Sequence, residues 1–155
     1  MIERITIQHV PSEDRIRMNC SSATKPDTVI WLSRHLLDKL LPHLVDLVGG
    51  YADFMEETSP SLDGQPLKEA DQTGDKDINS CCAWLATSVD VSVIDANYCL
   101  AWRSDRDHAA TVCFSREELC QFLICIRRCY SYGQWHFSFR DGSRLTAGPG
   151  VETIH

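Results

Sequence analysis

Apolar and polar residues alternate one by one in several short stretches of the chain, and this period of two is typical of strands with one buried face. Between residues 87 and 93, Val89, Val91 and Val93 alternate with two serines and an aspartate. The same alternation predicts further strands within residues 3–10, 16–20, 30–32, 98–102, 112–114 and 135–139. Strands are therefore expected to form a large part of the fold.

Two longer stretches have their apolar residues three and four positions apart, which predicts amphipathic helices. Ser33 and Ser115 each stand where a strand pattern ends and a helical pattern begins, so each is expected to cap a helix N terminus. Glu118 completes a capping box with Ser115. The predicted core stripe of the second helix consists of Leu119, Phe122, Leu123, Ile126 and Tyr130.

The first helix has an unusually wide apolar face, which covers roughly half of its circumference. The residues on this face are Leu36, Leu37, Leu40, Leu41, Leu44, Val45, Leu47 and Val48. Packing on one sheet face requires a narrower apolar face, so the helix is expected to pack also against the second helix or a partner subunit. Pro42 lies in its interior and is expected to kink or break it. The candidate protein interface consists of Leu41, Val45 and Val48, with Ile124 on the polar side of the second helix.

Two segments of the chain, residues 16–41 and 98–123, match without a gap at an offset of 82 residues. Under this offset Met18 falls on Leu100, and Ser33 falls on Ser115. The shared pattern is strand, turn, strand, helix, and each segment follows one more alternating run. The sequence therefore predicts a βββα unit that occurs twice, with the two halves related by a pseudo-twofold axis.

The predicted fold is α+β, with an antiparallel sheet, or two related half-sheets, and two main helices packed on one side. A single domain over residues 1–155 would consist of two similar halves, about 2–55 and 81–140. Residues 56–80 hold seven acids, two lysines and almost no large apolar residue, which predicts an acidic flexible linker. Residues 141–155 are expected to form a flexible tail.

Composition narrows the range of partners. The hydrophobic fraction of 43% and the charged fraction of 24% are ordinary for a globular protein. The net charge of −7 leaves no basic stripe for phosphate groups, so nucleic acids and anionic membrane surfaces are unfavourable partners. No apolar run is long enough to predict a membrane span, and the first residues lack a secretory-signal pattern. The protein is therefore expected in the cytoplasm.

Eight cysteines raise the question of metal or redox chemistry. No C-x-x-C pair occurs, and one helix cannot direct Cys120, Cys125 and Cys129 onto a single ion. In a reducing compartment all eight are expected to be thiols that behave as small apolar side chains. The alternative is a zinc, copper or redox site formed by Cys81, Cys82, Cys125 and Cys129.

The sequence lacks the phosphate-binding, nucleophile-elbow and dinucleotide-binding motifs of common enzyme classes. The first hypothesis is therefore a non-enzymatic interaction or accessory protein without a cofactor, which uses an apolar helix face to bind a protein partner or to form a homodimer. The thiol-based protein is the alternative, and a small-molecule binder or enzyme with a cleft between the halves is a weaker one. Such a cleft would be lined by Trp31, Tyr98 and Trp102. Acid–base chemistry is conceivable at Asp105, Asp107 and His108.

Overall fold

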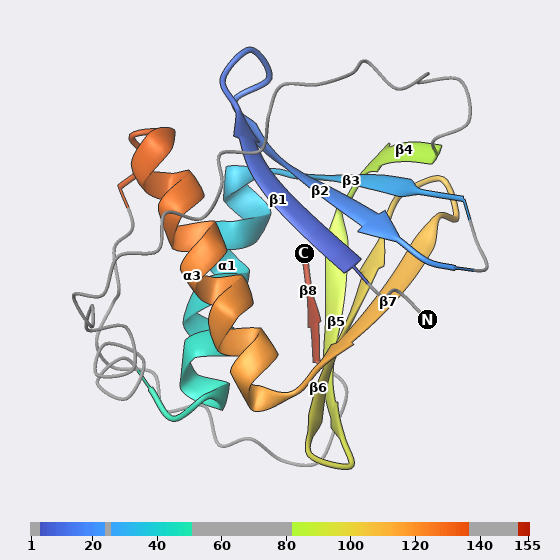
Figure 1. Ribbon diagram of the computed structural model, residues 1–155, viewed down its shortest axis with the longest axis vertical. Helices are drawn as coiled ribbons and strands as arrows, with labels where there is room; N and C mark the ends of the chain where they lie inside the picture. Colours follow the sequence, from blue (N-terminus) through green and yellow to red (C-terminus); the bar gives the residue numbers. More distant parts are fainter. Residues whose placement is uncertain (1–3, 24–25, 51–81, 137–151) are drawn as a thin grey trace.

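The computed structural model of this chain describes residues 4–23, 26–50, 82–136 and 152–155. The predicted linker at 56–80 lies outside these residues, as do Cys81 and most of the predicted tail. Within the described part, the strands form two sheets, and both helices lie on one side of them (Figure 1). The fold is therefore α+β, as the sequence predicts.

The first sheet has the strand order β1-β2-β3-β4. Its strands are β1 (Arg4–Val10), β2 (Arg15–Ser21), β3 (Thr28–Leu32) and β4 (Cys82–Leu85). The first three strands pair antiparallel, and β4 pairs parallel to β3. This parallel pair is not part of the antiparallel sheet that the sequence predicts.

The second sheet has the strand order β7-β6-β5-β8, and all of its pairs are antiparallel. Its strands are β5 (Ser88–Ile94), β6 (Asn97–Arg103), β7 (Ala109–Phe114) and β8 (Glu152–Ile154). The short connection from β4 to β5 joins the two sheets. There the Ala86 N–H donates to the carbonyl oxygen of Trp31, and the Thr87 N–H donates to that of Arg103.

The helices are α1 (Arg34–Leu47) and α3 (Arg116–Tyr132), and both predicted caps are confirmed. The Ser33 hydroxyl accepts the Leu36 N–H, and the Ser115 hydroxyl accepts the Glu118 N–H. The Glu118 carboxylate accepts the Ser115 N–H in return, which completes the capping box.

The two helices run antiparallel and are joined near both ends. The Arg116 guanidinium donates to the carbonyl oxygen of Val48 at 2.9 Å, and the Tyr130 hydroxyl donates to Asp38 at 2.8 Å. Residues of both helices and both sheets form one hydrophobic core. Its largest fully buried side chains are Ile16, Met18, Ile30, Leu32, Leu37, Leu40, Leu44, Val89, Leu100, Trp102, Leu119 and Ile126.

The strand register agrees with the offset of 82 residues found in the sequence. Met18 of β2 pairs with Ile30 of β3, and Leu100 of β6 pairs with Val112 of β7. Each member of the second pair lies 82 positions after its counterpart in the first. The duplication of the βββα unit stays a prediction, but the β2–β3 and β6–β7 pairs can be compared residue by residue.

The strands that precede these two pairs, β1 and β5, correspond at an offset that is larger by two residues. Ile7 of β1 pairs with Met18, and Val91 of β5 pairs with Leu100, so this offset is 84. The β1–β2 turn uses residues 11–14, whereas the β5–β6 turn uses only residues 95–96, both with positive φ. The shorter turn therefore accounts for the change of offset.

The C-terminal part differs from the prediction. Trp135 and His136 lie outside any strand, and residues 137–139 of the predicted last strand are outside the described part. The final strand is instead β8, at the end of the predicted flexible tail. A strand of three residues is too short to give a recognisable alternation. β8 is identified by its antiparallel pairing with β5.

For the first helix the sequence predicts a kink or a break at Pro42, and the structure contradicts the break. Pro42 lies inside α1, but the helix continues on both sides of it and is not broken. Proline removes a single N–H donor at this position. The apolar residues of α1 before and after Pro42 lie in the core, so packing holds both parts in one helix.

Candidate protein-binding groove

The two sheets leave two edge strands beside α3. β1 is the edge of the first sheet and β7 the edge of the second, and among the described residues no further strand pairs with either. Both strands contact α3, and Figure 1 shows α3 beside β1. A hollow of about 520 Å³ lies between the three elements. Its lining residues are Ile5, Ile7, Val112, Cys113, Phe114, Glu117, Glu118, Gln121, Phe122 and Cys125.

A second hollow of about 530 Å³ adjoins the first and shares Ile7 and Cys125 with it. It continues between β1 and the C-terminal half of α3. Its other lining residues are Gln8, His9, Pro11, Arg128, Cys129 and Tyr132. The two hollows together form a channel along α3, which we call the β1–α3 groove.

The first hollow is apolar inside and acidic at its rim. Ile5 and Ile7 pack against the core but stay partly exposed, and the rings of Phe114 and Phe122 lie 5.2 Å apart. Among the described residues, its lining has two charged side chains, Glu117 and Glu118, and both are exposed. An apolar interior with few polar groups is typical of a binding site.

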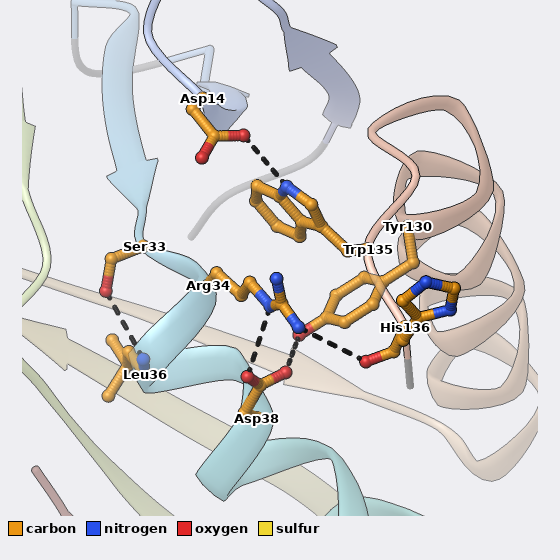
Figure 2. A network of polar contacts seen from close by, with 8 residues as sticks. All are labelled: Asp14, Ser33, Arg34, Leu36, Asp38, Tyr130, Trp135 and His136. Atoms are coloured by element: carbon orange, nitrogen blue, oxygen red, sulfur yellow. Dashed lines mark hydrogen bonds and ion pairs between the residues drawn. The ribbon is translucent and has the colours of Figure 1, made fainter. Parts of the chain in front are cut away.

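A cluster of polar contacts holds the far end of α3 in place (Figure 2). The Trp135 indole N–H donates to Asp14 in the β1–β2 turn at 2.8 Å. The ring of Trp135 meets the rings of Tyr130 and His9 edge-on, with centroid distances of 5.1 and 5.3 Å. These contacts fix the β1–β2 hairpin against α3 and therefore fix one wall of the groove.

The same cluster joins α3 to α1. Arg34 lies 3.4 Å from Asp38, donates to the carbonyl oxygen of His136 and stacks over Trp135 (Figure 2). Burial and the hydrogen bond to Asp38 both raise the pKa of Tyr130, so this hydroxyl stays protonated and keeps donating. The hydrogen bonds of Trp135, Tyr130 and Arg34 therefore link α3 to α1 and to the β1–β2 turn, and they act as a clamp between these elements.

Comparison with known proteins gives no relative. No family model, curated protein or solved structure matches this chain. Within the described residues, neither helix is long and apolar enough to cross a lipid bilayer. Inferences about function therefore rest on the geometry of the chain itself.

The predicted interface residues lie mostly inside the chain. Leu41, Val45 and Val48 of α1 have exposed fractions of 4%, 3% and 2%, and Ile124 is partly buried against the same core. Cys120, one turn before Ile124, is also buried, so α3 has a wider apolar face than predicted. The antiparallel packing of the helices accounts for both wide faces within the chain.

The cysteines are distributed over several places. Cys99 and Cys113 lie opposite one another on β6 and β7 and form a disulfide. The expectation that all eight are thiols is therefore wrong for this pair, because the strand register that brings them together was not predicted. Cys113 is exposed and its neighbours Val112 and Phe114 are buried, as the alternation predicted for residues 112–114 requires.

The remaining thiols do not converge. Cys82 is exposed on β4, at the opposite edge of the first sheet from β1, whereas Cys125 and Cys129 lie next to β1. Among the described residues no group of three metal-ligating side chains is present. Burial is the main reason that the pKa of Cys129 rises to about 11, which keeps this thiol protonated at neutral pH. Cys81 lies outside the described part.

The aromatic residues proposed for a cleft are separated in the structure. Trp102 is fully buried in the core, Tyr98 donates to the carbonyl oxygen of Leu47, and Trp31 faces away from the core on β3. They do not line a common space.

The polar turn after β6 is organised by Ser104, whose hydroxyl accepts the N–H groups of Arg106 and His108. Asp105 and Asp107 are exposed there. This arrangement is that of a hairpin turn.

Sequence reasoning missed the groove residues Ile5, Ile7 and Gln121. The signal that could have identified them was the repeat, because Ile5 and Ile7 correspond to Val89 and Val91 at the offset of 84. The difference in their surroundings becomes visible only when the edge of each sheet is known.

Proposed function

We propose that this chain is a non-enzymatic interaction protein that binds a protein partner in the β1–α3 groove. The observation that supports the proposal is the open edge of β1 beside an apolar hollow. An edge strand offers a row of N–H and C=O groups to a further strand. Next to it, Ile5, Ile7 and Phe122 offer apolar contacts for alternate side chains.

A protein partner fits this geometry better than the thiol-based alternative. A metal or redox centre needs accessible thiolates. Cys129 is buried with a raised pKa, and Cys82 lies on another strand at a distant edge. As part of the proposal we place the protein in the cytoplasm, because five of the seven described cysteines form no disulfide, and thiols persist best under reducing conditions. The Cys99–Cys113 disulfide would be reduced there.

Site-specific photo-crosslinking tests the proposal. A photoreactive residue at Gln121, exposed in the middle of the groove, should capture a polypeptide in the native cell. The same residue at Asp46, exposed on α1 and outside the groove, is the matched control and should capture none. Ile7→Lys places a charge on the groove wall and should abolish the product at Gln121.

The mass of the crosslinked product separates a foreign partner from a second copy of this chain. Equal products from Gln121 and Asp46, or a product at Gln121 that Ile7→Lys leaves unchanged, would show that the groove is not the binding site.

A further inference from the structure

β8 pairs with the edge of β5 that lies away from β6. It pairs antiparallel with Val89–Val91 of β5, and Ile154 packs against the core. Lys39 of α1 donates to the carbonyl oxygen of His155 at 2.7 Å. The strand therefore bonds to β5 along its length and to the adjacent helix at its end.

The β1–α3 groove contains the counterparts of the residues that hold β8. Ile5–Ile7 of β1 correspond to Val89–Val91 at the offset of 84, and Gln121 of α3 corresponds to Lys39 at the offset of 82. Ile5, Ile7 and Gln121 all line the first hollow.

Burial differs between the two sites in the direction that a missing strand would produce. Val89 and Val91 have exposed fractions of 0% and 3% under β8, whereas Ile5 and Ile7 are only partly buried. Among the described residues, β1 has no neighbour on the side where β5 has β8.

We propose that the β1–α3 groove binds an extended segment of a partner protein, which pairs antiparallel with Ile5–Ile7 as β8 pairs with Val89–Val91. This inference rests on the proposed function and specifies the chemistry of the partner. Main-chain hydrogen bonds to β1 would supply affinity, and alternate side chains would enter the groove.

The lining predicts the sequence of the bound segment. The residues opposite Ile7 and Ile5 face the apolar hollow and should be aliphatic. The next residue on the same face, two positions further, would lie toward the N-terminal turn of α3. β1 and α3 run in the same direction along the groove, because Ile5 lines the first hollow with Glu117 and His9 lines the second with Cys129. Glu117 and Glu118 are the charged residues among the described lining of this hollow, so that position should be basic.

A partner protein suits the groove better than the C-terminal strand of a second copy. Each chain has one β8, and it already occupies β5 of its own second sheet. A second copy would have to lose that pairing in order to gain an equivalent one.

Binding of a synthetic peptide tests the inference directly. The probe is the fluorescently labelled peptide Thr-Val-Thr-Ile-Thr-Lys-Gly, in which valine would lie opposite Ile7 and isoleucine opposite Ile5. Fluorescence anisotropy with the full chain should show saturable one-to-one binding. Two further peptides carry backbone N-methyl groups on alternate residues. Only the peptide methylated on the edge that faces β1 should lose binding, because successive residues direct their N–H groups to opposite edges.

Variants of the protein locate the site. Ile7→Lys should weaken binding by about tenfold or more, the size of one lost central contact. Val93→Lys is the matched control, because Val93 is 53% exposed on β5 and away from the groove, and it should leave affinity unchanged. Glu117→Lys alters an exposed residue and leaves the core intact. It should weaken binding several-fold, and a peptide with glutamate in place of lysine should recover the loss.

The outcomes separate this inference from the proposed function. Crosslinking at Gln121 without peptide binding, or binding that is insensitive to N-methylation and to Glu117→Lys, would overturn the strand inference and leave the interaction function standing. A dimer that Ile7→Lys converts to monomers would identify a second copy as the occupant. A monomer in which the Ile5–Ile7 amides that do not bond to β2 resist hydrogen exchange without peptide would identify a segment of the same chain. Either result would overturn the proposal of a partner segment.

Discussion

β1 and β5, the first strands of their sheets in chain order, have equivalent neighbours on one side and differ on the other. β1 and β5 each pair antiparallel with the following strand, in registers that match residue by residue. The outer side of β5 pairs with β8, and the outer side of β1 has no strand among the described residues. Val89 is fully buried, whereas Ile5 at the corresponding position is not. The isoleucine is larger than the valine but less buried, so the difference in burial follows from the neighbouring strand and not from the residue type.

The helices extend the comparison to the far end of each strand. α1 has 14 residues and α3 has 17, and the last turn of α3 with its C-cap Gly133 lies against His9 near the end of β1. His9 of β1 is enclosed there and directs its backbone N–H to the Cys129 sulfur, whereas Val93 at the corresponding position of β5 is 53% exposed. The β1 edge is therefore more open at Ile5–Ile7 than at His9, so the first hollow is the part of the groove that leaves room for a further strand.

The largest expected effect comes from truncating the covered strand. Val89→Ala removes buried methyl groups from a packed site and should lower the free energy of unfolding by roughly 2–3 kcal/mol. Ile5→Ala removes more carbon atoms from a partly exposed site and should cost only about 1 kcal/mol. Urea denaturation of both variants measures the difference. An Ile5→Ala loss equal to or larger than that of Val89→Ala would show that β1 is covered after all.

The His9 end of β1 gives the next effect. Gly133 caps α3, and a methyl group added there would lie 2.8 Å from Nε2 of His9, whose ring is enclosed by Trp135. Gly133→Ala should therefore cost roughly 1–3 kcal/mol through overpacking. Thermal unfolding checks the loss. His9→Ala in the same chain removes the clash and should reduce the additional effect of Gly133→Ala to near zero. Equal effects in both backgrounds would contradict the close approach as the cause.

Local signals made much of the fold predictable. Ser115 and Glu118 formed the predicted capping box, and the stripe from Leu119 to Tyr130 is buried as the spacing of its apolar residues predicts. These features depend on interactions within one or two helical turns. The alternation from residue 87 to 93 marked β5 for the same reason.

The features that the sequence did not reveal depend on pairing between distant segments. The parallel β3–β4 pair, the Cys99–Cys113 disulfide and β8 all require a register between strands, and local periodicity contains no information on register. The groove was missed for the same reason. Ile5 and Ile7 alternate like any half-buried strand residues, and only the order of strands shows that their outer edge is free of a described partner.

The smallest effect belongs to a contact that only the covered edge has. Asp90 of β5 accepts the Thr153 hydroxyl of β8 and the Arg103 guanidinium of β6, each at 2.6 Å. These two hydrogen bonds, that of Thr153 first, lower the pKa of Asp90 below its ordinary value of 3.8. Thr6, the counterpart of Asp90 on β1, has no carboxylate, so the open edge lacks this ionisable contact.

A lowered pKa in the folded state stabilises the fold above the unfolded pKa, and this contribution is lost as the pH falls through the folded value. Asp90→Asn should therefore cost less than about 1 kcal/mol at neutral pH, because the contact lies at the surface. Its deficit relative to the unaltered chain should begin to shrink below the ordinary pKa of 3.8, where the carboxylate of the unfolded chain is protonated. The deficit should continue to shrink as the pH falls through the lowered pKa of the folded state. Urea denaturation at pH 7 and at pH 3 measures this change. A stability deficit that is constant with pH would show that the charge of Asp90 does not contribute to these hydrogen bonds. The two edges would then not differ in their electrostatics.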